Sequence, residues 1–182
     1  NHASSNLLIL EFWLDASSLS IGPYVIVDFE DDNFGFNYGV RYDYKSLESK
    51  DQTFDINYNN EFSNTSFSAG IFYKYLDNTL RLTYSGAYRA PHFSELFSDG
   101  VHHGTNRYEI GNINLDIEQA NQIDLKYQWA DEHFGIVINP FFQDISNFIS
   151  ITPSDSFQNN YRVYNYIQYK SVNIKGVELN LH

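Results

Sequence analysis

Two stretches decide how this chain folds, Tyr88-Arg89-Ala90-Pro91-His92-Phe93-Ser94-Glu95-Leu96-Phe97 and Glu109-Ile110-Gly111-Asn112-Ile113-Asn114-Leu115. Residues 80–88, which lead into the first stretch, alternate between apolar and small or polar side chains, and this period of two predicts a β-strand. Pro91 ends that strand, because it has no amide hydrogen to donate to a neighbouring strand. A second alternating segment, at 122–129, follows the second stretch. The two stretches therefore bracket a long connection between two strands.

The same alternation is found along most of the chain. From Phe34 to Tyr44 it continues over eleven residues, which is long for a strand of a soluble domain. Side chains opposite the apolar ones are mostly small or polar, as in a strand with lipid on one side and water or protein on the other. Short connectors alternate with longer ones, the short ones at 30–33, 77–78 and 130–132 and the longer ones at 46–52, 89–120 and 152–160. We therefore predict an all-β fold, an antiparallel transmembrane β-barrel fragment of about nine strands.

Composition narrows the class of protein. Aromatic residues make up 18% of the 182 residues, and they favour both strands and membrane interfaces. A mean hydropathy of −0.42 and the lack of any apolar run near about 20 residues exclude a bundle of transmembrane helices. The formal net charge of −12 argues against a nucleic-acid partner, because binding to phosphates depends on cationic side chains. Without cysteine, the chain has neither disulfides nor thiolate metal sites.

The sequence carries no signature of catalysis. Gly-x-Ser-x-Gly, His-Glu-x-x-His, a phosphate loop and a dinucleotide fingerprint are all missing from it. Carboxylates are numerous, yet nothing in their spacing marks two of them as an acid and a base. We therefore predict that the chain is not an enzyme.

The two opening stretches resemble paired motifs in the barrel of TonB-dependent outer-membrane receptors. In that family an aromatic-Arg-Ala-Pro box closes one strand and a Gly-Asn-Pro-Asp-Leu-like box opens the next. The residues that match these boxes are Arg89, Pro91, Gly111, Asn112 and Leu115. Weaker similarities follow in the order and spacing of the family, at 39–44, 116–121, 141–149, 164–166 and 174–179. The resemblance covers most of the chain, roughly residues 22–181.

The resemblance implies a fold, a location and partners. Such receptors are 22-stranded barrels closed by an N-terminal plug, and they import siderophores, haem, metals, cobalamin or glycans with energy from the TonB complex. About nine strands cannot close such a barrel, so we expect residues 1–182 to be part of the barrel domain from its later half, with the plug domain absent. We expect an outer membrane of a Gram-negative bacterium, contact with its lipid, and TonB acting through the missing N-terminal region. The expected cargo is a metal or metal complex, such as zinc, an iron–siderophore or haem.

The connection between the two boxes carries candidate ligands for that cargo. His102 and His103 are adjacent and Asp99 precedes them, so imidazole and carboxylate groups are available to a metal ion. His92 and Glu95 flank the connection and are candidates to complete the site. Haem receptors of the family also place a histidine between these boxes. The alternative is a solvated polar loop, because neighbouring side chains of an extended chain point in different directions.

Arg89 has two possible roles that the sequence does not separate. An inward-pointing arginine at the end of a strand can meet an anionic substrate or carboxylates of the plug. It can equally form a structural ion pair at the barrel wall.

Two other architectures remain open at the level of sequence. A stand-alone outer-membrane barrel of about eight to ten strands fits this length. A soluble β-sandwich that binds sugars through exposed tyrosines would suit the aromatic content, although its strands are usually shorter.

Overall fold

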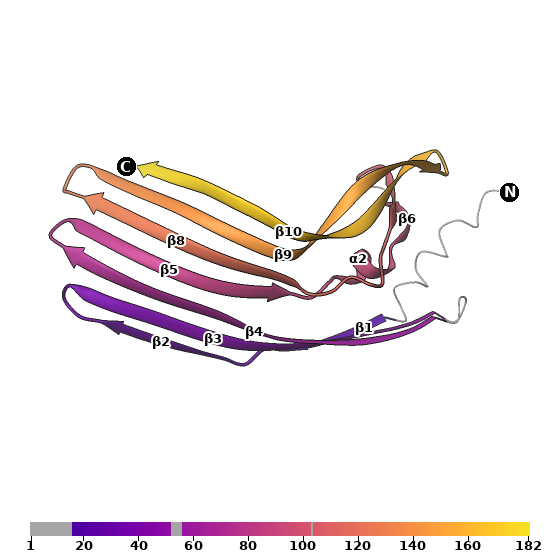
Figure 1. Ribbon diagram of the computed structural model, residues 1–182, viewed down its shortest axis with the longest axis horizontal. Helices are drawn as coiled ribbons and strands as arrows, with labels where there is room; N and C mark the ends of the chain where they lie inside the picture. The colour runs from indigo at the N-terminus through magenta and orange to yellow at the C-terminus, as the bar shows by residue number, and fades with distance from the viewer. Residues whose placement is uncertain (1–15, 52–55, 103) are drawn as a thin grey trace.

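A single curved sheet makes up most of the structure, a computed structural model that describes residues 16–51, 56–102 and 104–182. Its ten strands lie in the order β1-β3-β4-β5-β8-β9-β10-β7-β6, with β2 also paired to β3 (Figure 1). The strands are β1 (Ala16–Ile21), β2 (Tyr24–Glu30), β3 (Phe34–Asp51), β4 (Ile56–Tyr75), β5 (Asn78–Arg89), β6 (Asp99–His102), β7 (Arg107–Ile110), β8 (Glu118–Ala130), β9 (Gly135–Gln158) and β10 (Tyr161–Leu181). A five-residue helix, α2 (Phe93–Phe97), follows β5. In the described ranges, no helix is long and apolar enough to cross a membrane.

The predicted all-β, antiparallel architecture is confirmed. Strands β1–β5 and β8–β10, which we call the wall, pair with one another only in antiparallel fashion, and the one parallel pair in the described ranges joins β10 to β7. β1 and β2 form one interrupted strand along the same edge of β3. Ile21 at the end of β1 pairs with Tyr44, Tyr24 at the start of β2 pairs with Arg41, and the register on β3 is the same for both. The strand count of ten exceeds the predicted nine partly because the connection at 89–120 contains the hairpin of β6 and β7.

Two of the three predicted long loops are wrong, because strands continue through them. β3 reaches Asp51, which pairs with Ile56 of β4, so residues 46–51 belong to a strand. β9 continues to a tight hairpin at Asn159 and Asn160, whose φ angles are 52° and 67°. Asparagine tolerates this left-handed backbone, which two-residue hairpins require. The long hairpins β3–β4 and β9–β10 therefore extend the wall on the side away from the short turns (Figure 1).

Three glycines of the wall each lie opposite a phenylalanine of the neighbouring strand. The pairs are Gly35 with Phe72, Gly86 with Phe67, and Gly176 with Phe141. A Cβ atom on any of these glycines would collide with the ring of its partner. The ring covers backbone that would otherwise lack packing, and a shift of register would place it against a side chain.

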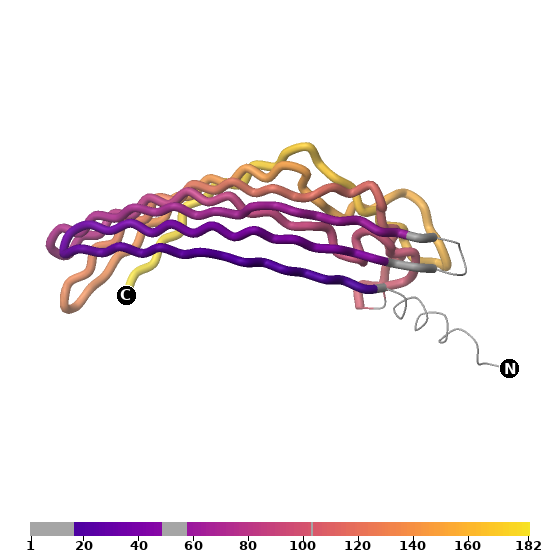
Figure 2. The backbone as a smooth tube through the Cα atoms, turned by 90° about the horizontal axis from the view of Figure 1, so that it is seen from below, coloured from indigo at the N-terminus to yellow at the C-terminus, as the bar shows by residue number. Residues whose placement is uncertain are grey.

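The wall is an open arc (Figure 2). Its two faces differ in chemistry. Phe62 of β4 and Leu96 of α2 belong to one buried cluster, so the face that carries Phe62 is the one that α2 covers, the concave one. The convex face carries large apolar side chains that are exposed, among them Phe34, Tyr38, Ile71, Tyr73, Leu80, Leu82, Tyr84, Ile123 and Leu125. The alternate, concave positions of the same strands are mostly small or polar, among them Gly39, Ser68, Gly70, Thr83, Ser85 and Gln122.

The apolar band on the convex face runs obliquely across the strands. One row of residues across the wall is apolar from end to end, and it consists of Phe34, Tyr73, Leu80, Tyr127, Ile138 and Leu179. A second row lies nearer to the end of the wall that carries the β9–β10 hairpin, a direction that we call up. This row begins with Val40 and Phe67 but becomes polar at Asn121, Asp144 and Asn173. The upper border of the band is therefore lower on β8–β10 than on β3 and β4.

The slope of this border matches the tilt of strands in a membrane barrel. On β3 the border lies at Tyr42, and on β10 it lies at Val177. Val177 is in the same row across the wall as Phe36 of β3, and Phe36 is six residues below Tyr42. Six residues of about 3.4 Å across five strand steps of about 4.8 Å give a slope of about 40°. Barrel strands tilt by about 35–45°, so the border becomes level when the strands have that tilt.

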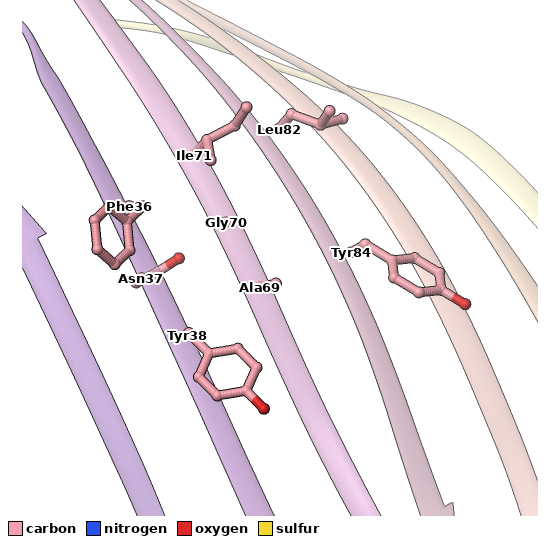
Figure 3. Close-up of a pocket in the computed structure, with 8 residues that line it drawn as sticks. All are labelled: Phe36, Asn37, Tyr38, Ala69, Gly70, Ile71, Leu82 and Tyr84. Carbon is pink, nitrogen blue, oxygen red and sulfur yellow. The ribbon is translucent and has the colours of Figure 1, made fainter.

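One shallow depression interrupts the band. Ala69 lies between Tyr38 and Tyr84, and the missing bulk leaves a hollow above β4 (Figure 3). Ile71 and Leu82 line its other end. Since the hollow is apolar and convex-facing, it belongs to the outer surface of the wall.

The structure contradicts both alternative architectures. A β-sandwich needs two packed sheets, whereas the described residues form one. A small closed barrel needs its first and last wall strands to pair, yet within the described residues neither β1 nor β2 pairs with β10.

Arginine substitutions on β8 test the position of the band. Leu125→Arg places a charge inside the band, whereas Asn121→Arg places it on the same face of the same strand, above the border. We expect Leu125→Arg to lower the free energy of unfolding by about 2–4 kcal/mol and Asn121→Arg by about 0–1 kcal/mol. Denaturant titration of the complete protein in lipid vesicles measures both values. Equal costs would show that the band does not face lipid.

Candidate functional site

The wall divides toward the end that carries the β9–β10 hairpin, which is on the right in Figure 1 and which we call the upper end. The connection between β5 and β8 fills the division (Figure 1). The ladder between β4 and β5 stops at the pair Phe67 and Gly86, although β4 continues beyond it. A hydrophobic core fills the space on the concave side, formed by Leu47, Phe62, Leu96, Leu115 and Ile149. It joins β3, β4 and β9 of the wall to α2 and to residues 111–117, which we call the returning segment.

Arg89 fastens both ends of the connection. It is the last residue of β5, and its guanidinium bonds both carboxylate oxygens of Glu95 in α2, at 3.1 and 2.8 Å. It also reaches Glu118, the first residue of β8 and its direct partner across the strands, at 3.3 Å. Both carboxylates are largely buried and both accept a backbone amide as well, from His92 and Ile149 respectively. Arg89 thus forms structural ion pairs within the chain, which is one of the two roles that the sequence left open for it.

The other residues of the family motifs hold the returning segment against α2. A Cβ atom on Gly111 would collide with the backbone of Leu96, so glycine permits the close approach. The Asn112 amide then donates to the Glu95 carbonyl at 2.8 Å, and Leu115 enters the core. Pro91 is fully buried at the end of β5.

Gln168 of β10 clamps the far end of the returning segment. Its side-chain nitrogen donates to the carbonyl oxygens of Asp116 and Asn147, each at 2.8 Å, and its side-chain oxygen accepts the Asp116 amide at 3.1 Å. The Asn147 side chain donates in turn to the Ile117 carbonyl at 3.2 Å. The connection is therefore bonded to the wall at its start, at its helix and at its end.

The hairpin of β6 and β7 is held by a second buried cluster around Glu109. This carboxylate is 4% exposed, and it accepts hydrogen bonds from Arg107 at 2.7 Å and from the Tyr166 hydroxyl at 3.0 Å. Burial, together with the bond to Glu109, raises the pKa of Tyr166 to about 12. Tyr108 donates to Asp99 at 2.8 Å, and burial with that bond raises its pKa to about 12 as well.

The predicted ligand residues are spread over the connection. His92 precedes α2 and is exposed, whereas Glu95 is engaged by Arg89. Asp99 is engaged by Tyr108, and exposed His102 contacts Thr105 through Nδ1 at 3.1 Å. His103 lies outside the described residues. Among the residues the structure describes, no three histidine, aspartate or glutamate side chains form a group that could hold a metal ion. Metal binding by His102 and His103 stays a prediction.

A polar depression adjoins the returning segment on the other side. It lies between Asn60–Ser63 of β4 and Ile113–Ile117, where the ladder between β4 and β5 has ended. Reasoning from the sequence did not single out this depression, nor Glu109, Glu118, Tyr166 and Gln168. For Glu109 and Glu118, the local sequence offers one clue to a structural role, their position beside the Gly-Asn-x-x-Leu box. For Tyr166 and Gln168 it offers none, because both lie far along the chain, on β10.

Removing the Arg89 guanidinium should loosen the connection. In Arg89→Ala, two largely buried carboxylates lose their cation, which we expect to cost about 2 kcal/mol and to speed hydrogen exchange in 90–117. Arg41→Ala is the matched control, because its pair with Asp43 is mostly exposed and contributes about 0–1 kcal/mol. Unchanged exchange in 90–117 of Arg89→Ala would contradict the fastening role.

Alkaline pH should open the hairpin of β6 and β7. A tyrosine whose pKa is raised on folding stabilises the fold fully below its unfolded value of about 10, and this contribution is lost as pH rises to about 12. We expect exchange protection at 99–110 to fall between these two values. Tyr166→Phe should make the fall smaller, and an unaltered pH profile in this variant would refute the assignment.

Comparison with known proteins places this geometry in a family. The sequence matches the family described as TonB dependent receptor-like, beta-barrel, over residues 13–182. No curated protein sequence matches it significantly. The fold is similar to that of the copper transporter OprC, with a TM-score of 0.77 and 18% identity over 92% of this chain and 26% of that one.

Two further solved structures share the fold. The hemophore receptor HasR of Serratia marcescens, solved with its hemophore HasA and heme, has a TM-score of 0.75 and 13% identity over 90% of this chain and 31% of its own. The FrpB iron transporter of Neisseria meningitidis has a TM-score of 0.64 and 17% identity over 91% of this chain and 23% of its own. The chain thus spans 23–31% of the length of these three chains. Its family match covers nearly all of its residues, and the chain belongs to the TonB-dependent receptor β-barrel family.

Proposed function

We propose that the chain is part of the wall of an outer-membrane receptor that imports a metal or a metal complex with energy from TonB. Zinc, an iron–siderophore and haem are the cargo candidates. The observation that carries the membrane part of this proposal is the oblique apolar band, whose border becomes level at the tilt of barrel strands. TonB would act through parts of the receptor that lie outside residues 1–182.

The import part of the proposal draws on the likeness to receptors whose names refer to copper, heme and iron. Within this chain it is supported by the position of the connection between β5 and β8. Residues 90–117 are bonded to the concave side at the upper, divided end of the wall. A substrate that enters the lumen from that end would pass this connection. Exposed His92 and His102 offer imidazole groups along it, and His103 follows His102 in sequence.

Uptake by cells tests both the import and the role of the histidines. Cells that express the complete protein as their only receptor of this kind should accumulate radioactive zinc or iron–siderophore, or should grow on haem as sole iron source. Accumulation should stop when TonB is deleted or the proton gradient is collapsed. We expect His102→Ala with His103→Ala to lower uptake at limiting cargo by about tenfold, the effect of losing about 1.4 kcal/mol of binding.

His133→Ala is the matched control, because His133 is exposed in the turn between β8 and β9, at the other end of the wall. Transport that is unchanged in the double variant would remove the histidines from the proposal but leave import standing. Cells that gain no cargo of any of the three kinds would overturn the proposed function.

A further inference from the structure

One edge of β4 has no partner strand, among the described residues, at the upper end of the wall. β4 runs from Ile56 to Tyr75, but its ladder with β5 ends at Phe67, so the part above Phe67 pairs with β3 alone. In the ranges that the structure describes, no backbone hydrogen bond joins this part of β4 to the returning segment either. The polar depression lies between the two. We call the backbone of residues 59–65 on this side the open edge.

The alternation of a strand identifies which backbone groups lie on the open edge. The Lys74 amide donates to the carbonyl of Asn33, which precedes β3, so amides at even positions of β4 point toward β3. Amides at odd positions point away from β3, since the register of the two strands has no bulge. Glu61 and Ser63 therefore direct their N–H and C=O groups into the division. The Glu61 amide agrees with this orientation, because it donates to the Asn60 side chain at 3.0 Å.

The other long strand that borders the division, β9, is blocked against further pairing (Figure 1). It is kinked at Asn147, where φ is 56°, its Ile149 amide donates to Glu118 at 2.9 Å, and Pro153 has no amide to donate. Proteins use kinks, proline and charge in this way to prevent unwanted strand pairing. Residues 56–66 contain neither proline nor lysine, and they pair with β3 without a kink. The open edge thus keeps a shape with which another strand can pair.

The surroundings of the open edge are acidic and lie above the apolar band. Tyr42, at the border of the band, pairs with Thr65, so residues 59–63 lie above the border. Exposed Glu61 lines the polar depression on one side, and exposed Asp116 lines it on the other. In the part of the chain that the structure describes, neither carboxylate forms an ion pair.

We propose that the open edge binds an extended segment of a separate protein by strand addition, and that this segment carries lysine or arginine at alternate positions. The backbone groups of Glu61 and Ser63 supply hydrogen bonds of the kind found in a sheet. Alternate side chains of an added strand share one face, so a basic set can meet the carboxylates of Glu61 and Asp116 together. The chain itself has 23 acidic and 11 basic residues, so a basic partner complements it in charge. The inference rests on the membrane orientation in the proposed function and not on the cargo.

Peptide binding to the complete protein in lipid nanodiscs tests the proposal. The probe is a fluorescent peptide of alternating lysine and threonine, about seven residues long, which is enough to span the open edge. Fluorescence anisotropy measures its affinity, and hydrogen exchange locates it. We expect the saturating peptide to slow exchange of the Ser63 amide by about tenfold and to leave the Asn64 amide, which points toward β3, unchanged. A peptide of alternating glutamate and threonine is the control and should not bind.

Methylated peptides separate strand addition from simple attraction of charge. Two versions of the lysine peptide carry N-methyl groups, one on every lysine and the other on every threonine, and both keep the full charge. An added strand turns one of these two sets of amides toward β4. At least one version should therefore bind about tenfold more weakly than the unmethylated peptide, the loss of about 1.4 kcal/mol. Unchanged affinity of both versions would overturn the proposal.

Variants of the receptor test the role of the two carboxylates. Glu61→Gln and Asp116→Asn should each weaken binding of the lysine peptide about two- to fivefold, the effect of losing one exposed ion pair. Glu132→Gln is the matched control, because Glu132 is exposed in the turn at the opposite end of the wall. Equal affinities in all three variants would remove the basic partner from the proposal and overturn it.

Two results with the receptor alone would also contradict strand addition by a partner. Slow exchange of the Ser63 amide without any peptide would show that another segment of the receptor covers the open edge. Exchange that slows as the receptor concentration rises would show a second copy there. Either result leaves cargo uptake unaffected, so failure here is distinct from failure of the proposed import.

Discussion

One cation, Arg89, holds together the part of the chain where the wall divides. It closes β5, opposes the first residue of β8 and reaches into α2, so a single guanidinium joins three elements. The fork geometry of arginine matters, since a lysine ammonium is a point charge and cannot address two carboxylates in this planar way. The core of Leu96 and Leu115 packs behind these ion pairs. The hydrophobic contact is non-directional, whereas the ion pairs require a fixed geometry and therefore specify where the connection lies on the wall.

The wall itself obeys a simpler rule, in which each strand has one apolar and one polar or small face. Because the wall strands pair in antiparallel register, these faces merge into two continuous surfaces of opposite character. The convex surface is apolar only in an oblique band, and this obliqueness distinguishes a tilted barrel strand from an amphipathic strand of a soluble sheet. The concave surface is left to small residues and to a few charges, such as Arg81 and Lys126.

Alternation and turn residues were sufficient to predict the wall strands, because their side-chain period depends on local sequence. They were not sufficient at Ser46–Asp51 and Thr152–Gln158, where polar residues suggested loops although pairing with β4 and β10 continues. Outside the apolar band, a strand needs no apolar face, so its sequence looks like that of a loop. The motifs marked the connection correctly, but not its internal structure. Gln168 and Tyr166 lie more than fifty residues from their partners in it, and no local pattern records such contacts.

The parallel pairing of β7 with β10 limits what can join the wall next. β7 occupies the hydrogen-bonding edge of β10 at Val163–Asn165, on the side away from β9. A further strand on that side must stop below Asn165, because two strands cannot share one edge. On the other side, β9 stays paired with β10 up to the tight hairpin. The rim of the lumen is thus stepped at β10, and a bulky object would have its widest approach over the lower side.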